Sequence, residues 1–140
     1  MAASRRASPA RRRGIPTARS RRRRGWVRVE KDAQRKIVAT TEDAEFALLR
    51  IGVRHVPQIH SHRESQVGVI ISGAGVHRML LSVRRGRRTV KQVTELLLRP
   101  GDCYFIPPDV PHEFQVEGNR PVVALDVTLA KPRRRAGRLD

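Results

Sequence analysis

The chain has 140 residues, a length that fits one domain. Hydrophobic residues make up 39% of it and aromatic residues only 4%, so the sequence predicts an aliphatic core. Its one cysteine excludes an internal disulfide, and no apolar run approaches the ~18 residues of a membrane-spanning helix. The single cysteine fits a reducing compartment or one of either redox state, and we expect a protein of the cytoplasm with no membrane partner.

The net charge of +17 is concentrated at the two ends of the chain. Residues 1–24 contain ten arginines and no acidic residue, whereas acidic and basic side chains nearly balance over residues 26–130. We predict a disordered arginine-rich tail over residues 1–25, a folded domain over residues 26–130 and a basic C-terminal tail over residues 131–140. For the N-terminal tail, an arm for nucleic acid, a transit peptide and a start site placed too far upstream stay open. The lack of interleaved aromatic residues favours a plain disordered extension.

The folded part begins with segments that alternate in the manner of β-strands. Residues 26–30 predict an edge strand, and because such a strand exposes unpaired backbone groups, we expect it to pair with a second subunit in a homodimer. Further strands are expected over residues 36–41 and 46–53, separated by a turn at residues 42–45. His55 follows in a bend, where we expect it to face solvent.

Two histidines separated by one residue mark the middle of the chain, where residues 60–66 read HSHRESQ. Side chains alternate along an extended strand, so His60 and His62 are predicted to lie on one face. Imidazole is a good ligand for zinc, nickel, copper and iron, and the amide oxygen of Gln66, in the same phase, could add a neutral ligand. This stretch therefore predicts a metal site on a strand.

A hairpin is expected after this stretch. Residues 76–83 should pair with residues 89–98 across a basic tip at residues 84–88. His77 belongs to the first of these strands, and the sequence leaves its face open.

A third histidine comes near the end of residues 99–114, which read RPGDCYFIPPDVPHEF. A Pro-Gly turn opens a short apolar strand here, and a proline-rich turn closes it and delivers His112. No long stretch of the chain combines helical periodicity with caps, so we predict an all-β domain.

These two stretches resemble the motifs of the cupin superfamily, G-x5-H-x-H-x3,4-E-x6-G followed by G-x5-P-x-G-x2-H-x3-N. The positions that fit are His60, His62, Gln66 (in place of Glu) and Gly73 in the first motif, and Gly101, Pro107 and His112 in the second. The positions that depart from the motifs are Arg54, Asp109 and Val116. The resemblance implies a small cupin barrel, a double-stranded β-helix of the jelly-roll type, in a single copy.

A closer resemblance is to the pectin-degradation cupins that ketonise unsaturated uronates. It implies a divalent metal ion, nickel, zinc, iron or manganese, held by His60, His62, Gln66 and His112. Asp126 matches an acidic residue of that family's closing strand, and Arg133 or Arg134 approximates the arginine that follows it. Thr128 stands where those proteins tend to carry an aromatic residue.

Three classes of function stay open at this point. The first is a metal-dependent isomerase or lyase acting on an anionic sugar derivative, with Asp126 moving a proton and Arg78 binding a carboxylate. Tyr104 is a candidate for lining the substrate pocket. The second class is a non-catalytic cupin that senses or stores a small molecule, and the third is a metal-dependent oxygenase. The four neutral ligands favour the first class, because they leave a divalent ion its full charge as an electrophile.

Overall fold

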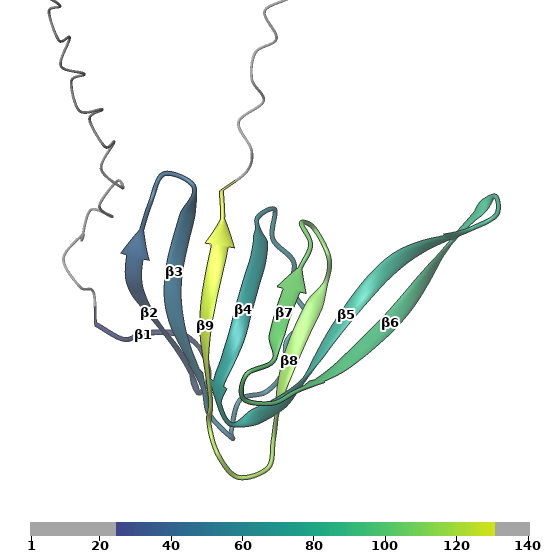
Figure 1. Ribbon diagram of the computed structural model, residues 1–140. Coiled ribbons are helices and arrows are strands. Elements are labelled where there is room, and N and C mark those ends of the chain that lie inside the picture. Colours follow the sequence, from purple (N-terminus) through teal and green to yellow (C-terminus); the bar gives the residue numbers. More distant parts are fainter. Residues whose placement is uncertain (1–24, 131–140) are drawn as a thin grey trace, which may run out of the picture.

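The computed structural model describes residues 25–130, which form an all-β domain (Figure 1). The strands in chain order are β1 (Val27–Glu30), β2 (Ala33–Thr40), β3 (Ala44–Ile51), β4 (Ser65–Ser72), β5 (Ala74–Arg85), β6 (Arg88–Leu98), β7 (Cys103–Ile106), β8 (His112–Glu117) and β9 (Val122–Leu129). The predicted fold class is thus confirmed. Within residues 25–130 there is no helix, and so none that could cross a bilayer. Apart from Gly25, the two predicted tails lie outside the described residues.

The strands form two antiparallel sheets that face each other across the core. One sheet has the order β1-β2-β3-β9-β4-β7, and the other has the order β6-β5-β8. The last strand, β9, is inserted between β3 and β4, so strands far apart in the sequence become neighbours. The buried cluster contains Ile70, Val122 and Ala124 from the larger sheet and Leu98 from the smaller one. This core is aliphatic, as the composition predicts.

The predicted hairpin is confirmed and projects from the rest of the domain. Strand β5 pairs with β6 from Gly75 to Arg85 but with β8 only from Ala74 to Met79. Beyond Met79 the hairpin continues as a two-stranded ribbon that extends away from the other strands (Figure 1). Its turn is tighter than predicted, because Arg85 already pairs with Arg88 and Gly86 takes a positive φ of 60°.

The two-histidine stretch does not lie on a strand, which corrects one expectation. Strand β4 begins at Ser65, and both His60 and His62 belong to the irregular segment before it. His60 nevertheless forms an isolated bridge with His112 at the start of β8. The His60 amide donates to the His112 carbonyl at 3.0 Å, and the His112 amide donates back at 2.9 Å. These two bonds place histidines 52 positions apart beside each other.

Candidate metal centre and its cavity

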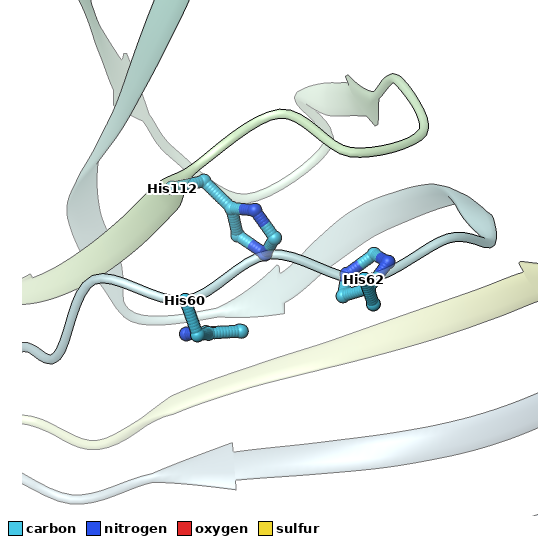
Figure 2. Close-up of side chains that lie close together, drawn as sticks. All are labelled: His60, His62 and His112. Carbon is cyan, nitrogen blue, oxygen red and sulfur yellow. The ribbon is translucent and has the colours of Figure 1, made fainter.

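Three histidines from two segments of the chain lie close together (Figure 2). The Nδ1 atom of each ring lies within hydrogen-bonding distance of a backbone carbonyl two residues away in sequence. The pairs are His60 with Gln58 at 3.0 Å, His62 with Glu64 at 2.6 Å, and His112 with Val110 at 2.8 Å. A carbonyl only accepts, so each Nδ1 carries the proton and each Nε2 keeps a free lone pair.

This arrangement suits a metal ion. One ligand atom from each of His60, His62 and His112 lies within 4.8 Å of the others, so the three could hold one divalent ion. The Nε2 atom of His62 is buried and has no hydrogen-bond partner among the described residues. Backbone carbonyls on the far ring nitrogens are the usual way in which metal-binding imidazoles are oriented. Burial, the main cause, also lowers the pKa of His112, which favours the neutral, ligating form.

A cavity of about 250 Å³ opens beside the three histidines. Residues of both sheets line it. Its apolar walls are formed by Leu49, Ile51, Ile70, Leu98, Ile106, Phe114, Val122 and Ala124, among others. Its polar lining includes Arg35, Gln66, His77, Tyr104 and Asp126 together with His60 and His112. A mostly apolar pocket with a few converging polar groups is the usual form of a small-molecule site.

Asp126 is the buried carboxylate of this cavity, with only 2% of its surface exposed. Its strand, β9, lies in the interior of the larger sheet, so the alternative of an edge-strand carboxylate does not apply. The Gln66 Nε2 atom donates to Asp126 Oδ2 at 3.0 Å. Because an ionised carboxylate only accepts, this bond fixes the orientation of the amide and leaves Gln66 Oε1 available as a ligand.

The surroundings of Asp126 shift its protonation. Burial raises the pKa of Asp126 to about 6, and Arg35, followed by His62, acts against this rise. The Oδ1 atom is buried and has no hydrogen-bond partner among residues 25–130. A carboxyl with this pKa and one free oxygen can both take up and release a proton near neutral pH.

Tyr104 reaches the same cavity because a glycine makes room for it. Gly68 pairs with Tyr104 on one side and with Asp126 on the other. A Cβ atom at position 68 would collide with the Tyr104 ring, so the ring lies directly over Gly68. Burial, and then Asp126, raises the pKa of the Tyr104 hydroxyl. Tyr104 is therefore neutral and lines the pocket.

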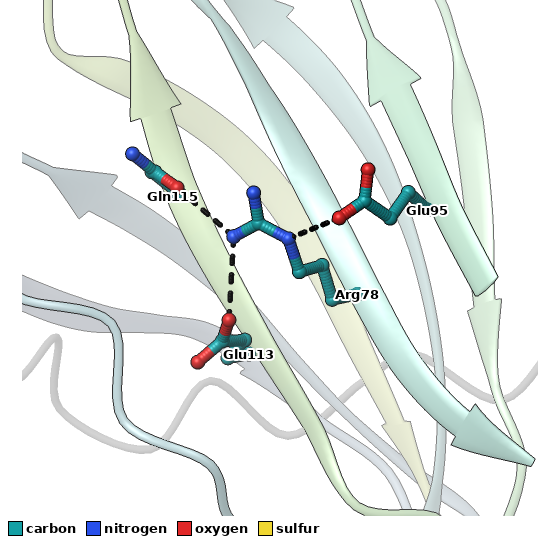
Figure 3. Close-up of polar contacts among 4 residues, drawn as sticks. All are labelled: Arg78, Glu95, Glu113 and Gln115. Carbon is teal, nitrogen blue, oxygen red and sulfur yellow. Dashed lines mark hydrogen bonds and ion pairs between the residues drawn. The ribbon is translucent and has the colours of Figure 1, made fainter. Parts of the chain in front are cut away.

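Arg78 does not reach the cavity. The alternation of β5 turns it to the outer face of the smaller sheet, where it contacts neighbouring strands (Figure 3). Its Nε donates to Glu95 at 2.6 Å, and its Nη1 donates to Gln115 at 2.9 Å and to Glu113 at 3.3 Å. This placement corrects the expectation that Arg78 contacts substrate from inside the barrel.

Another arginine, which sequence reasoning passed over, does line the cavity. Arg35 on β2 pairs with Leu49 of β3, on the inner face, and its Nη2 lies 2.7 Å from Glu45 Oε1. It is the one Lys or Arg side chain among the described residues of the cavity wall. The sequence signal was weak, because the predicted strand began only at residue 36, whereas β2 begins at Ala33 and its inner face is defined by its pairing with β3.

Two further histidines lie where the sequence did not place them. The His55 side chain is only 6% exposed rather than solvent-facing, and its Nδ1 lies 3.2 Å from the Lys31 carbonyl. His77 is 3% exposed on the inner face of β5. Burial, followed by the nearby His112 and His60, lowers the pKa of His77 to about 4. The candidates Arg133 and Arg134 lie outside the described residues.

Comparison with known proteins agrees with this geometry. The family model of the cupin domain matches residues 47–128. The chain belongs to the cupin family. Residues 47–128 run from β3 to β9 and so contain all three histidines and Asp126.

Individual relatives of this cupin include both sequences and solved structures. KdgF from Halomonas sp. is 26% identical with a TM-score of 0.58, over 79% of this chain and 90% of that one. An RmlC-like cupin from Shewanella frigidimarina is 19% identical with a TM-score of 0.57, over 79% and 86% of the two chains. The oxalate decarboxylase of Lactobacillus farciminis is 14% identical with a TM-score of 0.59, over 78% and 31%. The last two likenesses concern the fold alone.

A curated relative of this cupin is an isomerase by name. The H2HPP isomerase of Bacillus subtilis is 30% identical over 89 residues, which are 64% of this chain. This cupin spans about a third of the length of that relative, since the match covers 33% of it.

Proposed function

We propose that this cupin is a metal-dependent isomerase that opens and ketonises an unsaturated uronate or a similar small sugar acid. The observation that carries the proposal is the buried Asp126 carboxylate, which shares a cavity with His60 and His112 of the three-histidine group and is hydrogen-bonded to Gln66. The motif resemblance to uronate-ketonising cupins, the 26% identity to KdgF and the isomerase-named relative support it.

The reaction needs two proton movements and no oxidant. The ring hydroxyl at the anomeric carbon loses its proton, the bond from that carbon to the ring oxygen breaks, and a carbonyl forms. The electron pair leaves with the ring oxygen as the enolate of the neighbouring double bond. One proton then adds to the far carbon of that double bond, which leaves a keto group. The proton lost equals the proton gained, so substrate and product are isomers.

The donor set of the site matches this chemistry. His60, His62 and His112 through Nε2, with Gln66 through Oε1, would hold a divalent ion that supplies Lewis acidity toward a substrate oxygen. Asp126 takes the hydroxyl proton on its unpartnered Oδ1 atom and returns it to carbon. A pKa of about 6 suits both halves of this cycle near neutral pH.

Arg35 is the proposed carboxylate-binding residue of the site, in place of Arg78. It already contacts Glu45 through Nη2, and a guanidinium offers further donors for a second carboxylate. The test uses a matched pair of variants at the two arginines. Arg35→Gln should raise KM for the unsaturated uronate about tenfold or more, since charge-assisted hydrogen bonds are lost. Arg78→Gln should leave KM unchanged, and equal effects at both positions would contradict the assignment.

The decisive experiment for the function is turnover of an unsaturated uronate, followed as loss of ring-alkene absorbance. Purified protein is assayed as isolated, after chelation, and after reloading with each of nickel, zinc, iron and manganese. Loss of activity on chelation and its return on reloading are expected. Absence of turnover with every ion would favour the non-catalytic binder, and uptake of dioxygen with turnover would favour an oxygenase.

We also propose a homodimer formed through β1. This strand lies at the edge of the larger sheet and pairs with β2 alone. Val27 and Val29 on β1 are 54% and 51% exposed, and Trp26 just before it is 42% exposed, so a partner strand would cover both backbone groups and apolar surface. Val27→Lys with Val29→Lys should lower the mass measured by light scattering from dimer to monomer. A wild type that is monomeric at micromolar concentration would contradict this assembly.

A further inference from the structure

His77 is a buried polar side chain that the proposed mechanism does not use. It projects from the inner face of β5, and its ring centroid lies 5.8 Å from those of both Tyr104 and His112. It is 3% exposed and belongs to the lining of the cavity. It is also absent from the group of three histidines whose ligand atoms converge. His77 therefore lies beside the candidate metal centre but is not one of its ligands.

Both ring nitrogens of His77 lack a hydrogen-bond partner among residues 25–130. A neutral imidazole always carries one N–H donor and one acceptor, so both are unsatisfied at once. The other histidines of the cavity differ in this respect, because His55, His60 and His112 each place Nδ1 against a backbone carbonyl. A buried polar group without a partner costs folding free energy, and it calls for a specific explanation.

A bound ligand explains the unpaired nitrogens of His77 better than a role of this side chain in packing does. The neighbours of His77 within its own sheet are Phe114 of β8 and Leu96 of β6, and a leucine or phenylalanine would pack against them at lower cost. The His77 side chain belongs to the lining of the same cavity as His112 and Asp126. Sugar hydroxyls both donate and accept, so they can satisfy an imidazole in either tautomer.

We propose that His77 is a specificity-determining residue that hydrogen-bonds a hydroxyl group of the sugar-acid substrate while that substrate is held at the metal centre. The inference rests on the proposed function for the identity of the ligand. It adds a contact that selects polyhydroxylated acids over simple carboxylic acids of the same size. A site with a polar group made for a hydroxyl rejects ligands that lack one, because the group is then left unpaired.

The test replaces His77 by an apolar and by a polar side chain. His77→Phe should raise KM for the unsaturated uronate about tenfold, with a smaller change in kcat and an unchanged metal content. His77→Gln can still offer a donor and an acceptor, so its KM should return to within about threefold of the wild-type value. Equal KM values for wild type and His77→Phe would overturn the inference, as would loss of metal from His77→Phe.

A second measurement needs no substrate and separates this inference from the proposed function. The melting temperature of ligand-free His77→Phe should exceed that of the wild type, because the substitution removes two unsatisfied nitrogens and buries more apolar surface. A fall of several degrees would show that His77 supports the fold and would overturn the inference. If the wild type fails to convert uronates but His77→Phe is more stable, the proposed function fails while the ligand-facing role of His77 stands.

Discussion

The two faces of β5 differ in whether their polar side chains have hydrogen-bond partners. On the outer face, Arg78 has three hydrogen-bonding partners from two neighbouring strands. On the inner face, the adjacent His77 is almost fully buried and has none among the described residues. A charge that is already satisfied by its own sheet is structural, whereas an unsatisfied group inside a cavity is available to a ligand. The comparison separates a polar residue whose partners lie in its own sheet from one that is left for the proposed ligand.

Removing the metal ligands on the inner side should have the largest effect. The double variant His60→Ala, His62→Ala leaves too few ligands for a stable site, so metal content should fall to background and turnover with it. His55→Ala is a matched control, since His55 lines the cavity outside the three-histidine group and should retain metal. Metal analysis of purified proteins checks both. Full occupancy in the double variant would exclude His60 and His62 as ligands.

The substitution Asp126→Asn should have the second largest effect on turnover. The amide cannot transfer a proton, so kcat should fall by on the order of 100- to 10,000-fold while metal content stays the same. Steady-state turnover of the unsaturated uronate measures the change. Glu113→Gln on the outer face is the control and should leave kcat unaltered. Equal turnover in wild type and Asp126→Asn would remove Asp126 from the mechanism.

Gln66→Glu should separate metal affinity from catalysis. A carboxylate ligand should bind the ion more tightly than an amide and should weaken it as an electrophile. The new charge would also adjoin Asp126 Oδ2, where Gln66 now donates at 3.0 Å, so the two carboxylates would share a proton. Chelator competition should show tighter metal binding, and turnover should fall. An unchanged metal affinity would argue that Gln66 is not a ligand.

The pH dependence of stability should distinguish His77 from its neighbours in the metal-free protein. The pKa of His77 falls from 6.5 to about 4 on folding, so between these values the unfolded chain binds the proton more readily and stability falls as the pH drops. His77→Phe removes this loss. Its advantage in unfolding free energy should therefore grow between neutral pH and pH 5, by on the order of 2 kcal/mol.

Urea unfolding of both metal-free proteins at the two pH values measures this difference. His60, His112 and Tyr104 surround position 77 in both proteins, and the opposite pH effect of Asp126 is common to both and cancels in the comparison. The coupling of His77 to His112 and His60 is lost with the imidazole, so it counts as part of the difference. A constant advantage across this pH range would show that His77 is not held neutral by burial.

The substitution Arg78→Ala should have the smallest effect on stability and turnover. Its ion pairs with Glu95 and Glu113 are partly exposed, and such pairs contribute little to stability. The melting temperature should change by a few degrees at most, and turnover and metal content should match the wild type. A large rise in KM would contradict the placement of Arg78 outside the site.

The sequence by itself determined the fold class and the candidate metal ligands. The spacing of His60, His62, Gln66 and His112 carries information because ligands for one ion must come from fixed positions of a barrel. The sequence also predicted the hairpin of β5 and β6, with a basic tip that contains Gly86, although the turn itself is tighter than predicted. The hairpin depends on local periodicity, whereas the full ligand set came from the resemblance to the cupin motifs, since His60 and His62 do not lie on the strand that their alternation predicts.

Only the tertiary structure decided which face of each strand lines the cavity. In β5 the polar residues His77 and Arg78 are adjacent and apolar residues flank both, so period-two alternation marks two faces without saying which is buried. The same holds for Arg35, whose inner position follows from pairing with β3 across a strand that contains a bulge. Register between distant strands is a long-range property, and it placed Arg35 and His77 in the site and Arg78 outside it.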